Sequence, residues 1–343
     1  MQEIQAQDAD FVCLQEIEKE AFEDFFSMKL AYSGYRGVFW SRSRARTMSE
    51  KDKKTVDGCA TFYKSSKYIL LDKQGVEFGN TAINRPDAKG QTDIFNRIMS
   101  RDHIGLLTFF ENRETGSRLL IAGTHIYWDP KYADVKLIQV ALLMAAINKA
   151  AEKYSKLPAC KDKKTYALAD MDTDTVSEIP DYAPSKEYSK TQIPLVICSD
   201  LNSTYESGVY ELLSKGQVSP DHPEIKGFSY GDFTKHGIEH PFQLRSAYTN
   251  LDKTPDAIPF TNYTGTFRGV IDHIWYSTNA LENVALLGGI DSEYMSKVPG
   301  FPNYHFPSDH MSLMAEFVVK GVKEKKQRVE PDFGSNRRDR RND

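Results

Sequence analysis

Short apolar runs of strand length recur along the whole 343-residue chain, and most of them end at a polar residue. Runs of this length, rich in β-branched and aromatic residues and bounded by turn-forming residues, are typical of β-strands. The pattern therefore predicts a fold built around extended sheets. The expected strands cover residues 9–15, 35–40, 58–63, 67–71, 103–111, 118–125, 193–202, 270–277 and 309–319.

Two longer segments have the period of an α-helix. Phe22, Phe26 and Leu30 lie at helical spacing within residues 18–30, and residues 132–154 repeat apolar side chains in the same way. Strands interspersed with helices indicate an α/β fold, and 40% hydrophobic residues in a chain of this length suffice for one large domain. We expect that domain to span residues 1–320.

Two polar segments interrupt or follow the predicted domain. Residues 156–192 are rich in Lys, Asp, Ser, Thr and Pro and have little periodicity, which predicts a surface insertion. Residues 321–343 are charged and poor in apolar side chains, which predicts a disordered tail. Both predictions concern mobility and surface position, and neither segment is expected to contribute to the core.

The cysteine pattern and the apolar runs indicate a cellular compartment, whereas the net charge says little about the binding partner. The four cysteines lack C-x-x-C spacing, which favours a reduced intracellular protein, cytoplasmic and also nuclear. No apolar run reaches the roughly 18 residues of a membrane-spanning helix, and no signal peptide begins the chain, so no membrane association is expected. The net charge is −4, and the basic runs at residues 42–46, 51–54 and 337–341 are interpreted as solvated loops or tail.

Polar residues that suit one kind of chemistry stand at the ends of the apolar runs. Taken singly, each has an ordinary explanation: a surface carboxylate, a turn pair or a core histidine. Together they are what metal-assisted phosphodiester hydrolysis requires, because carboxylates hold Mg²⁺ and histidines transfer protons or stabilise charge. Their co-occurrence favours a Mg²⁺-dependent nuclease or phosphatase. The residues are Glu16, His125, Asp200, Asn202, Asp272, Asp309 and His310.

The extended motifs around these residues resemble the endonuclease/exonuclease/phosphatase superfamily, and most closely its poly(A) deadenylases of the carbon catabolite repressor type. The resemblance covers residues 8–319 and rests on L-Q-E-I-E, T-H-I-Y-W-D-P-K-Y-A-D-V-K-L-I-Q, S-D-L-N-S, Y-T-G-T-F-R-G-V-I-D-H-I-W-Y and P-S-D-H. It implies a four-layer α/β sandwich, with two mixed β-sheets face to face and helices outside. It also implies a 3′→5′ exoribonuclease that shortens poly(A) tails and releases 5′-AMP.

The resemblance also assigns a metal site and its ligands. Glu16 matches the principal Mg²⁺ ligand, and Asp200 and Asp272 match carboxylates near the attacking water and a second metal. The resemblance therefore implies one or two Mg²⁺ ions, for which Mn²⁺ can substitute. Ser199 replaces the glycine that the superfamily has before its D-x-N pair, and we expect this small residue to be tolerated.

Further residues are assigned to the reaction and to the substrate. His125 matches a histidine that hydrogen-bonds the scissile phosphate. Asp309 and His310 match a terminal pair in which the aspartate orients the site and the histidine stabilises developing charge. Together with Asp200 and Asp272 these form the expected catalytic set. The residues expected to hold the adenine of single-stranded poly(A) RNA are Pro130, Asn202 and Phe267.

Two segments of the deadenylase pattern are not found in the sequence. The first core strand, which ends in a metal-site asparagine, is expected upstream of Glu16, and no asparagine occurs there. The leucine-rich repeat that docks the partner nuclease of a multi-subunit deadenylase complex is also absent. The chain therefore resembles an N-terminally truncated catalytic domain. The alternatives are another nuclease or phosphoesterase of the same superfamily, or a catalytically impaired RNA-binding module.

Overall fold

The computed structural model describes residues 1–158, 186–249 and 258–321. The predicted surface insertion at residues 156–192 and the predicted tail at residues 321–343 lie mostly outside these ranges and stay predictions. Within the described ranges, strands form close to where the apolar runs predicted them. Their pairing builds two main sheets.

The larger sheet has six strands in the order β10-β13-β7-β6-β5-β4. β5 pairs antiparallel with β4 and with β6, the latter as the predicted hairpin, while β6 and β7 run parallel. β13 pairs antiparallel with β7 and β10, so the sheet is mixed. Its strands are β4 Tyr68–Glu77, β5 Ile104–Asn112, β6 Arg118–His125, β7 Leu195–Asp200, β10 Leu244–Ser246 and β13 Asp272–Ser277.

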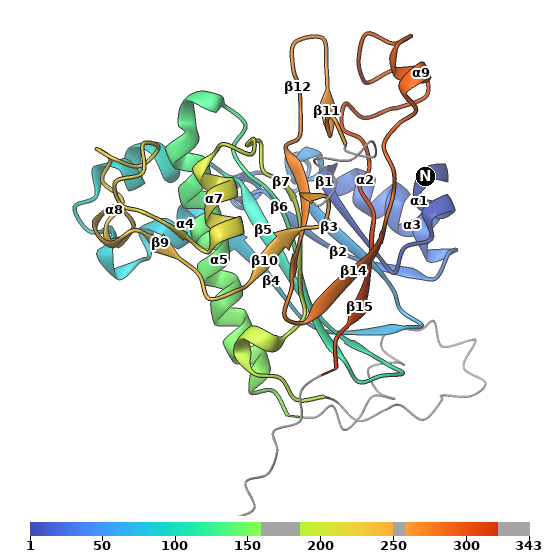
Figure 1. The fold of residues 1–343 in the computed structure, drawn as a ribbon, viewed down its shortest axis with the longest axis horizontal. Helices are drawn as coiled ribbons and strands as arrows, with labels where there is room; N and C mark the ends of the chain where they lie inside the picture. The colour runs from blue at the N-terminus through green and yellow to red at the C-terminus, as the bar shows by residue number, and fades with distance from the viewer. Residues whose placement is uncertain (159–185, 250–257, 322–343) are drawn as a thin grey trace, which may run out of the picture.

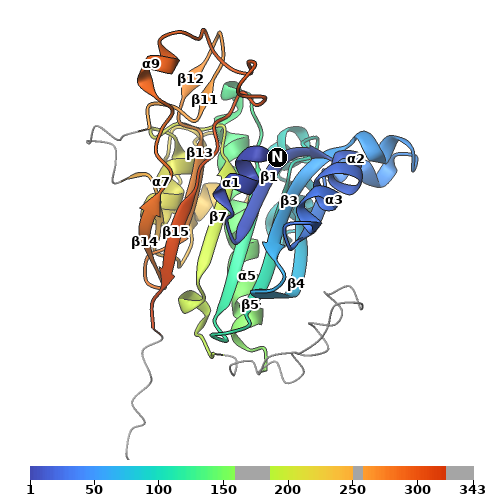
Figure 2. The ribbon, with the colours of Figure 1, turned by 90° about the vertical axis from the view of Figure 1, so that its right-hand side faces the viewer.

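The smaller sheet has three strands in the order β1-β3-β2, and its described pairings are antiparallel. It comprises β1 Phe11–Glu18, β2 Tyr35–Ser41 and β3 Asp57–Lys64. An antiparallel ribbon of β14 Leu281–Leu286 and β15 Ala315–Val319 lies beside it (Figure 2). Both cover the same face of the larger sheet.

Side-chain alternation along the strands divides the core into layers. Leu106 and Phe110 of β5 pack with Val38 and Tyr63 of the smaller sheet, and the rings of Tyr63 and Phe110 lie 4.9 Å apart. Phe109, one residue away, points to the opposite face, because successive strand residues face opposite sides of a sheet. The two sheets therefore lie face to face around a shared apolar core.

Helices cover the outer faces of both sheets (Figures 1 and 2). α5 Ala133–Ser155 packs on the larger sheet, with Tyr154 stacked on Phe109 at 3.9 Å between ring centroids. A helical segment over residues 19–31 buries Leu30 against Phe62 of the smaller sheet. The predicted α/β sandwich is confirmed, with the larger sheet mixed and the smaller one antiparallel in the described residues.

A lobe of short elements rises beyond one end of the sandwich (top of Figure 1). β11 Asn262–Tyr263, β12 Arg268–Gly269 and α9 Ser292–Met295 enclose a small core that includes Phe260 and Phe301. The predicted strand at residues 309–319 begins only at Ala315. Residues 309–311 instead form backbone hydrogen bonds to this lobe, since the Met311 N–H donates to the Thr261 carbonyl at 2.8 Å.

The other described elements are short and join the sheets to their helical layers. No helix among the described residues is long and apolar enough to cross a membrane. These elements are α1 Gln2–Gln7, α2 Lys19–Ala21, η1 Phe22–Phe26, α3 Ser27–Ala31, α4 Phe78–Ile83, α7 Gly208–Lys215, β8 Gln217–Val218, α8 Asp232–His236, β9 Ile238–Glu239 and the helical turns η2 Ser43–Thr47, η3 Asp52–Thr55, η4 Pro86–Ala88, η5 Ile94–Ile98, η6 Pro130–Tyr132 and η7 Lys190–Gln192.

Close packing between β2 and β3 makes Gly58 sensitive to substitution. An alanine Cβ there would lie 2.1 Å from the Trp40 carbonyl oxygen, whereas nothing lies within 4 Å of a Cβ at Gly288. Gly58→Ala should therefore lower the free energy of unfolding by about 1–3 kcal/mol, measured by urea denaturation. Gly288→Ala is the matched control, because both changes restrict the unfolded chain alike. Equal stability of the two variants would contradict this packing.

Candidate active site

Three polar residues lie in one row across the larger sheet. His125 is the last residue of β6, Asp200 is the last of β7, and the strand register pairs them. Asp272 is the first residue of β13, and the antiparallel register pairs it with Asp200. Because β6 and β7 run parallel and β13 runs against them, two strand ends and one strand start meet at the same sheet edge. The fold thereby gathers residues that are up to 147 positions apart by the numbering of His125 and Asp272.

His310 completes the row from outside the sheet. Its Nδ1 lies 2.8 Å from Asp272 Oδ2, and its Nε2 lies 4.0 Å from Asp200 Oδ2. On the other side, His125 Nε2 lies 3.5 Å from the same Asp200 oxygen. Asp200 therefore lies between two imidazole rings, with the Asp272 carboxylate beside it.

Burial and charge give these groups unusual proton affinities. Burial, together with the Asp272 charge, raises the pKa of Asp200 to about 8. Burial opposes protonation of His310, but the hydrogen bond that its Nδ1–H donates to Asp272 and the nearby carboxylates raise the pKa of His310 to about 9. Burial and then the Arg42 charge lower the pKa of His125 to about 4. One histidine is thus held charged and the other neutral near pH 7.

The donor set suits a divalent cation. One ligand atom from each of Asp200, Asp272 and His310 lies within 4.8 Å of the others. Two adjacent carboxylates in a buried setting repel each other, as the raised pKa of Asp200 shows. A cation would relieve that repulsion, and carboxylate oxygens are the ligands that hard divalent cations prefer. The described residues therefore fit a metal ion at this cluster.

Glu16 is placed at the site by a break in the smaller sheet. Between Leu14 and Ile17 the register of β1 against β3 shifts by one residue, and Glu16 has a φ of 55°. Such bulges re-aim side chains next to active sites. Glu16 thus lies within β1 and not at its end as the apolar run indicated. Its Oε1 lies 3.5 Å from His125 Nδ1, and its side chain is 66% exposed.

An open cleft adjoins the row on the Glu16 side. It has a volume of about 560 Å³, and its lining includes Glu16, His125, His103 and the exposed Trp128. Glu16 borders this cleft and is not part of the group formed by Asp200, Asp272 and His310. Its assignment as the principal metal ligand stays a prediction.

Asn202 is fixed in the loop that follows β7. Its backbone has a φ of 43°, and its N–H donates to Asp200 Oδ1 at 2.9 Å. Its side-chain Nδ2 donates to the Ile126 carbonyl at 3.2 Å, and the Asn202 carbonyl accepts from Lys136 Nζ at 2.7 Å. Asparagine tolerates this left-handed conformation better than most residues. Three hydrogen bonds, two of the backbone and one of the side-chain amide, therefore hold Asn202 beside Asp200.

Asp309 ties the segment that carries His310 to the protruding lobe. Its side-chain Oδ2 accepts a hydrogen bond from Asn262 Nδ2 at 3.1 Å, and its carbonyl accepts from the Tyr263 N–H at 3.1 Å. An isolated β-bridge joins Asn262 to His310. Asp309 thus contacts the lobe and adds negative charge near His310.

The residues predicted to hold a base lie on the surface. Pro130 is exposed at the start of η6, and Phe267 is 40% exposed between β11 and β12. Among the described residues, no hydrogen bond, ion pair or ring contact joins either of them to Asp200, Asp272 or His310. The Phe267 turn is nevertheless fixed, since Thr264 N–H donates to the Phe267 carbonyl at 2.8 Å. Their substrate roles stay predictions.

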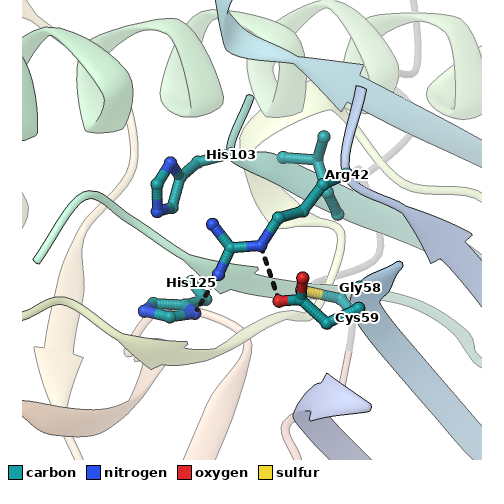
Figure 3. Close-up of a pocket in the computed structure, with 7 residues that line it drawn as sticks. Arg42, Gly58, Cys59, His103 and His125 are labelled. Carbon is teal, nitrogen blue, oxygen red and sulfur yellow. Dashed lines mark hydrogen bonds and ion pairs between the residues drawn. The ribbon is translucent and has the colours of Figure 1, made fainter. Parts of the chain in front are cut away.

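Arg42 belongs to the site although the sequence analysis placed it in a solvated basic run. Its side chain is 13% exposed, its Nε lies 2.6 Å from Asp57 Oδ2, and its Nη2 lies 3.1 Å from His125 Nδ1 (Figure 3). The His103 ring packs edge-on to His125 at 5.5 Å. Arg42 directly follows the last residue of β2, Ser41. The rule that selected the other residues, a polar side chain after an apolar strand, would have selected it too.

Comparisons by sequence agree on one family. A model described as the Endonuclease/Exonuclease/phosphatase family matches residues 1–310. The chain is 53% identical over 344 residues to a Phaeosphaeria nodorum protein named "CCR4-Not complex 3'-5'-exoribonuclease subunit Ccr4", and 54% identical over 334 residues to a Neurospora crassa protein of the same name. These alignments cover 99% and 96% of this chain but 57% and 42% of the relatives. The chain spans about half the length of these relatives.

Solved structures share the fold. ANGEL2, described as a 2',3'-cyclic phosphatase in complex with adenosine-2',3'-vanadate, is 25% identical with a TM-score of 0.64. That match covers 92% of this chain and 84% of ANGEL2. The human Nocturnin catalytic domain with bound sulfate is 20% identical with a TM-score of 0.56, covering 93% of this chain and 84% of Nocturnin.

The raised pKa of Asp200 has a consequence for stability. The folded protein holds this carboxyl protonated up to a pKa of about 8, well above the ordinary 3.8, so ionisation costs folding free energy as the pH rises between these values. In EDTA above pH 8, Asp200→Asn should therefore raise the free energy of unfolding by at least about 1 kcal/mol, since one pKa unit corresponds to about 1.4 kcal/mol.

Thermal unfolding across this pH range measures the effect. The stabilisation should shrink below pH 4, where Asp200 is protonated in both folded and unfolded states. Asp221→Asn is the control, because Asp221 is exposed and remote from the row. A destabilised Asp200→Asn variant at high pH would show that Asp200 is not the strained carboxylate described.

Proposed function

Because the chain belongs to the endonuclease/exonuclease/phosphatase family, we propose that it is a Mg²⁺-dependent 3′→5′ exoribonuclease that removes 5′-AMP from single-stranded poly(A). The observation that carries the proposal is the Asp200, Asp272 and His310 group beside a neutral His125. Two carboxylates for a metal and two histidines in opposite protonation states suit hydrolysis of a phosphodiester. The names of the fungal relatives support the exoribonuclease assignment.

Each residue of the row has a task that follows from its contacts. Bound Mg²⁺, held by Asp200 and Asp272 and, by resemblance, Glu16, would polarise the phosphoryl group and lower the pKa of water. His310, kept protonated by Asp272, places positive charge and an N–H next to Asp200, where it stabilises an anionic phosphoryl group. His125 contributes a neutral ring, which hydrogen-bonds phosphate without adding charge.

Substrate choice is proposed to depend on the surface residues around the row. Phe267 offers an exposed ring, and a Cβ at Gly269 would lie 2.8 Å from its Cζ, so the backbone of residue 269 closely supports the ring. A base stacked on such a ring gains about 1–3 kcal/mol. The Asn202 amide beside Asp200 and Pro130 at the start of η6 would complete the adenine site. The adenosine group in the ANGEL2 complex supports a nucleotide ligand for this fold.

The relatives' names also suggest an assembly. Both names describe a subunit of a CCR4-Not complex, and we propose that this chain acts within a multi-subunit deadenylase complex. Cytoplasmic action, with a nuclear fraction, is part of the same proposal and rests on the cysteine pattern. Fractionation of cells that express a tagged full-length protein would test the location.

Hydrolysis of oligo(A) tests the proposed reaction. With Mg²⁺, the chain should release 5′-AMP stepwise from the 3′ end of 5′-labelled oligo(A), and EDTA should abolish release because the carboxylates alone cannot activate water. Mn²⁺ should restore activity. Gel electrophoresis of the labelled products shows from which end the RNA is shortened, and chromatography identifies the released nucleotide. A chain that opens only 2',3'-cyclic phosphate ends, the activity named for ANGEL2, would replace the proposal with the alternative phosphoesterase.

Base preference tests the adenine site. Phe267→Ala should reduce kcat/KM on oligo(A) about five- to 160-fold, as expected for the loss of a stacking platform of about 1–3 kcal/mol, and should leave Mg²⁺ affinity unchanged. Tyr304→Ala is the matched control, because Tyr304 is an aromatic residue of the same lobe with 96% exposure. Equal rates of the unaltered chain on oligo(A), oligo(U) and oligo(C) would contradict an adenine site.

A further inference from the structure

Arg42 is held in one orientation by two carboxylates. Its Nε donates to Asp57 Oδ2 at 2.6 Å, and its Nη1 lies 3.6 Å from Asp102 Oδ1. The side chain is 13% exposed, so these contacts are largely shielded from water. A planar guanidinium fixed along one edge has little rotational freedom. Its remaining nitrogen, Nη2, points to His125 Nδ1 at 3.1 Å (Figure 3).

This contact determines which ring nitrogen of His125 carries a proton. Guanidinium has five donor hydrogens and no acceptor, and it stays charged at any physiological pH. Nη2 must therefore donate, and His125 Nδ1 must accept with its lone pair. A neutral imidazole that accepts at Nδ1 carries its hydrogen on Nε2. That nitrogen lies on the side of Asp200, 3.5 Å from Oδ2.

We propose that Arg42 is a positioning residue that fixes His125 in the Nε2–H tautomer and aims this N–H into the metal-binding row. His125 then acts as a hydrogen-bond donor to a phosphoryl oxygen and not as a base. Arg42 itself does not contact the reacting atoms. The inference rests on the proposed phosphodiesterase function for its kinetic consequence, but the tautomer is a property of the protein alone.

Glu16 could act as a competing partner that favours the other tautomer of His125, with the proton on Nδ1. Its Oε1 lies 3.5 Å from the same His125 Nδ1, and a carboxylate there would accept a proton from Nδ1–H. The Arg42 contact is shorter, at 3.1 Å, and Arg42 is anchored on both sides while Glu16 is 66% exposed. The fixed donor therefore sets the tautomer. Removal of Arg42 would leave Glu16 as the nearest partner and favour Nδ1–H.

Arg44 supplies a matched control. It pairs with the same two carboxylates, at 2.6 Å to Asp57 Oδ1 and 2.5 Å to Asp102 Oδ2. Its side chain is 45% exposed, and its described hydrogen bonds do not include His125. Replacing Arg44 thus removes a similar charge from the same ion-pair cluster and leaves the contact to His125 in place.

The tautomer is measured directly by NMR of the full chain labelled with ¹⁵N-histidine, without metal and with Mg²⁺. His125→Asn identifies the resonances of His125. The unaltered chain and Arg44→Met should show a protonated Nε2 and an unprotonated Nδ1. In Arg42→Met the protonated fraction should move to Nδ1. Finding Nδ1–H in the unaltered chain overturns the proposal, and this measurement stands even if Arg42→Met does not fold.

Kinetics on oligo(A) tests the consequence. Arg42→Met should lower kcat about tenfold or more with KM within about twofold, as for a lost transition-state contact, while Arg42→Lys recovers part of the rate and Arg44→Met stays within about twofold. If Arg42 acts through His125, Arg42→Met should cost nothing further in a His125→Ala background. Additive losses would overturn the positioning role. An inactive unaltered chain with the Nε2–H tautomer would reject the proposed function and not the tautomer assignment.

Discussion

The hydrogen-bond register across β6, β7 and β13 is the constraint on which the site depends. It pairs His125 with Asp200 and Asp200 with Asp272, so that three polar side chains share one edge of the sheet. A slip of one residue in β13 would turn Asp272 to the opposite face. The buried strands are well suited to prevent this, because Trp275 and the neighbouring apolar residues fill a core that admits one arrangement.

Electrostatic partners then give chemically identical residues different roles. His310 donates toward Asp272 and is held charged, whereas His125 accepts from Arg42 and is held neutral. Asp200 lies between them, and its burial, followed by the Asp272 charge, raises its pKa. The positive charge of His310 on one side and a metal ion on the other would both stabilise the ionised Asp200 carboxylate. The row is therefore an assembly of mutually dependent charges.

The strands and the polar residues at their ends could be predicted from the sequence, because they depend on the local pattern of apolar and polar residues. Apolar runs located β6 and β7, and their polar ends identified His125 and Asp200. Prediction failed where long-range contacts decide the backbone. The bulge at Glu16 depends on pairing with β3. The strand predicted over residues 193–202 ends at Asp200, and Asn202 follows it in a left-handed conformation. Arg42 follows the end of β2 and so carried the same signal, but the basic run around it suggested a solvated loop, and its burial depends on Asp57 and Asp102, which only the fold brings near.

We propose that the strand ends create one metal centre from Asp200 and Asp272. A crystal structure of the chain with Mn²⁺ and 5′-AMP, with the metal located by its anomalous scattering, tests this directly. We expect a peak bonded to carboxylate oxygens of Asp200 and Asp272, with the phosphate of AMP between His125 and His310. A peak bound elsewhere in the cleft, with Asp200 and Asp272 free of metal, would contradict it.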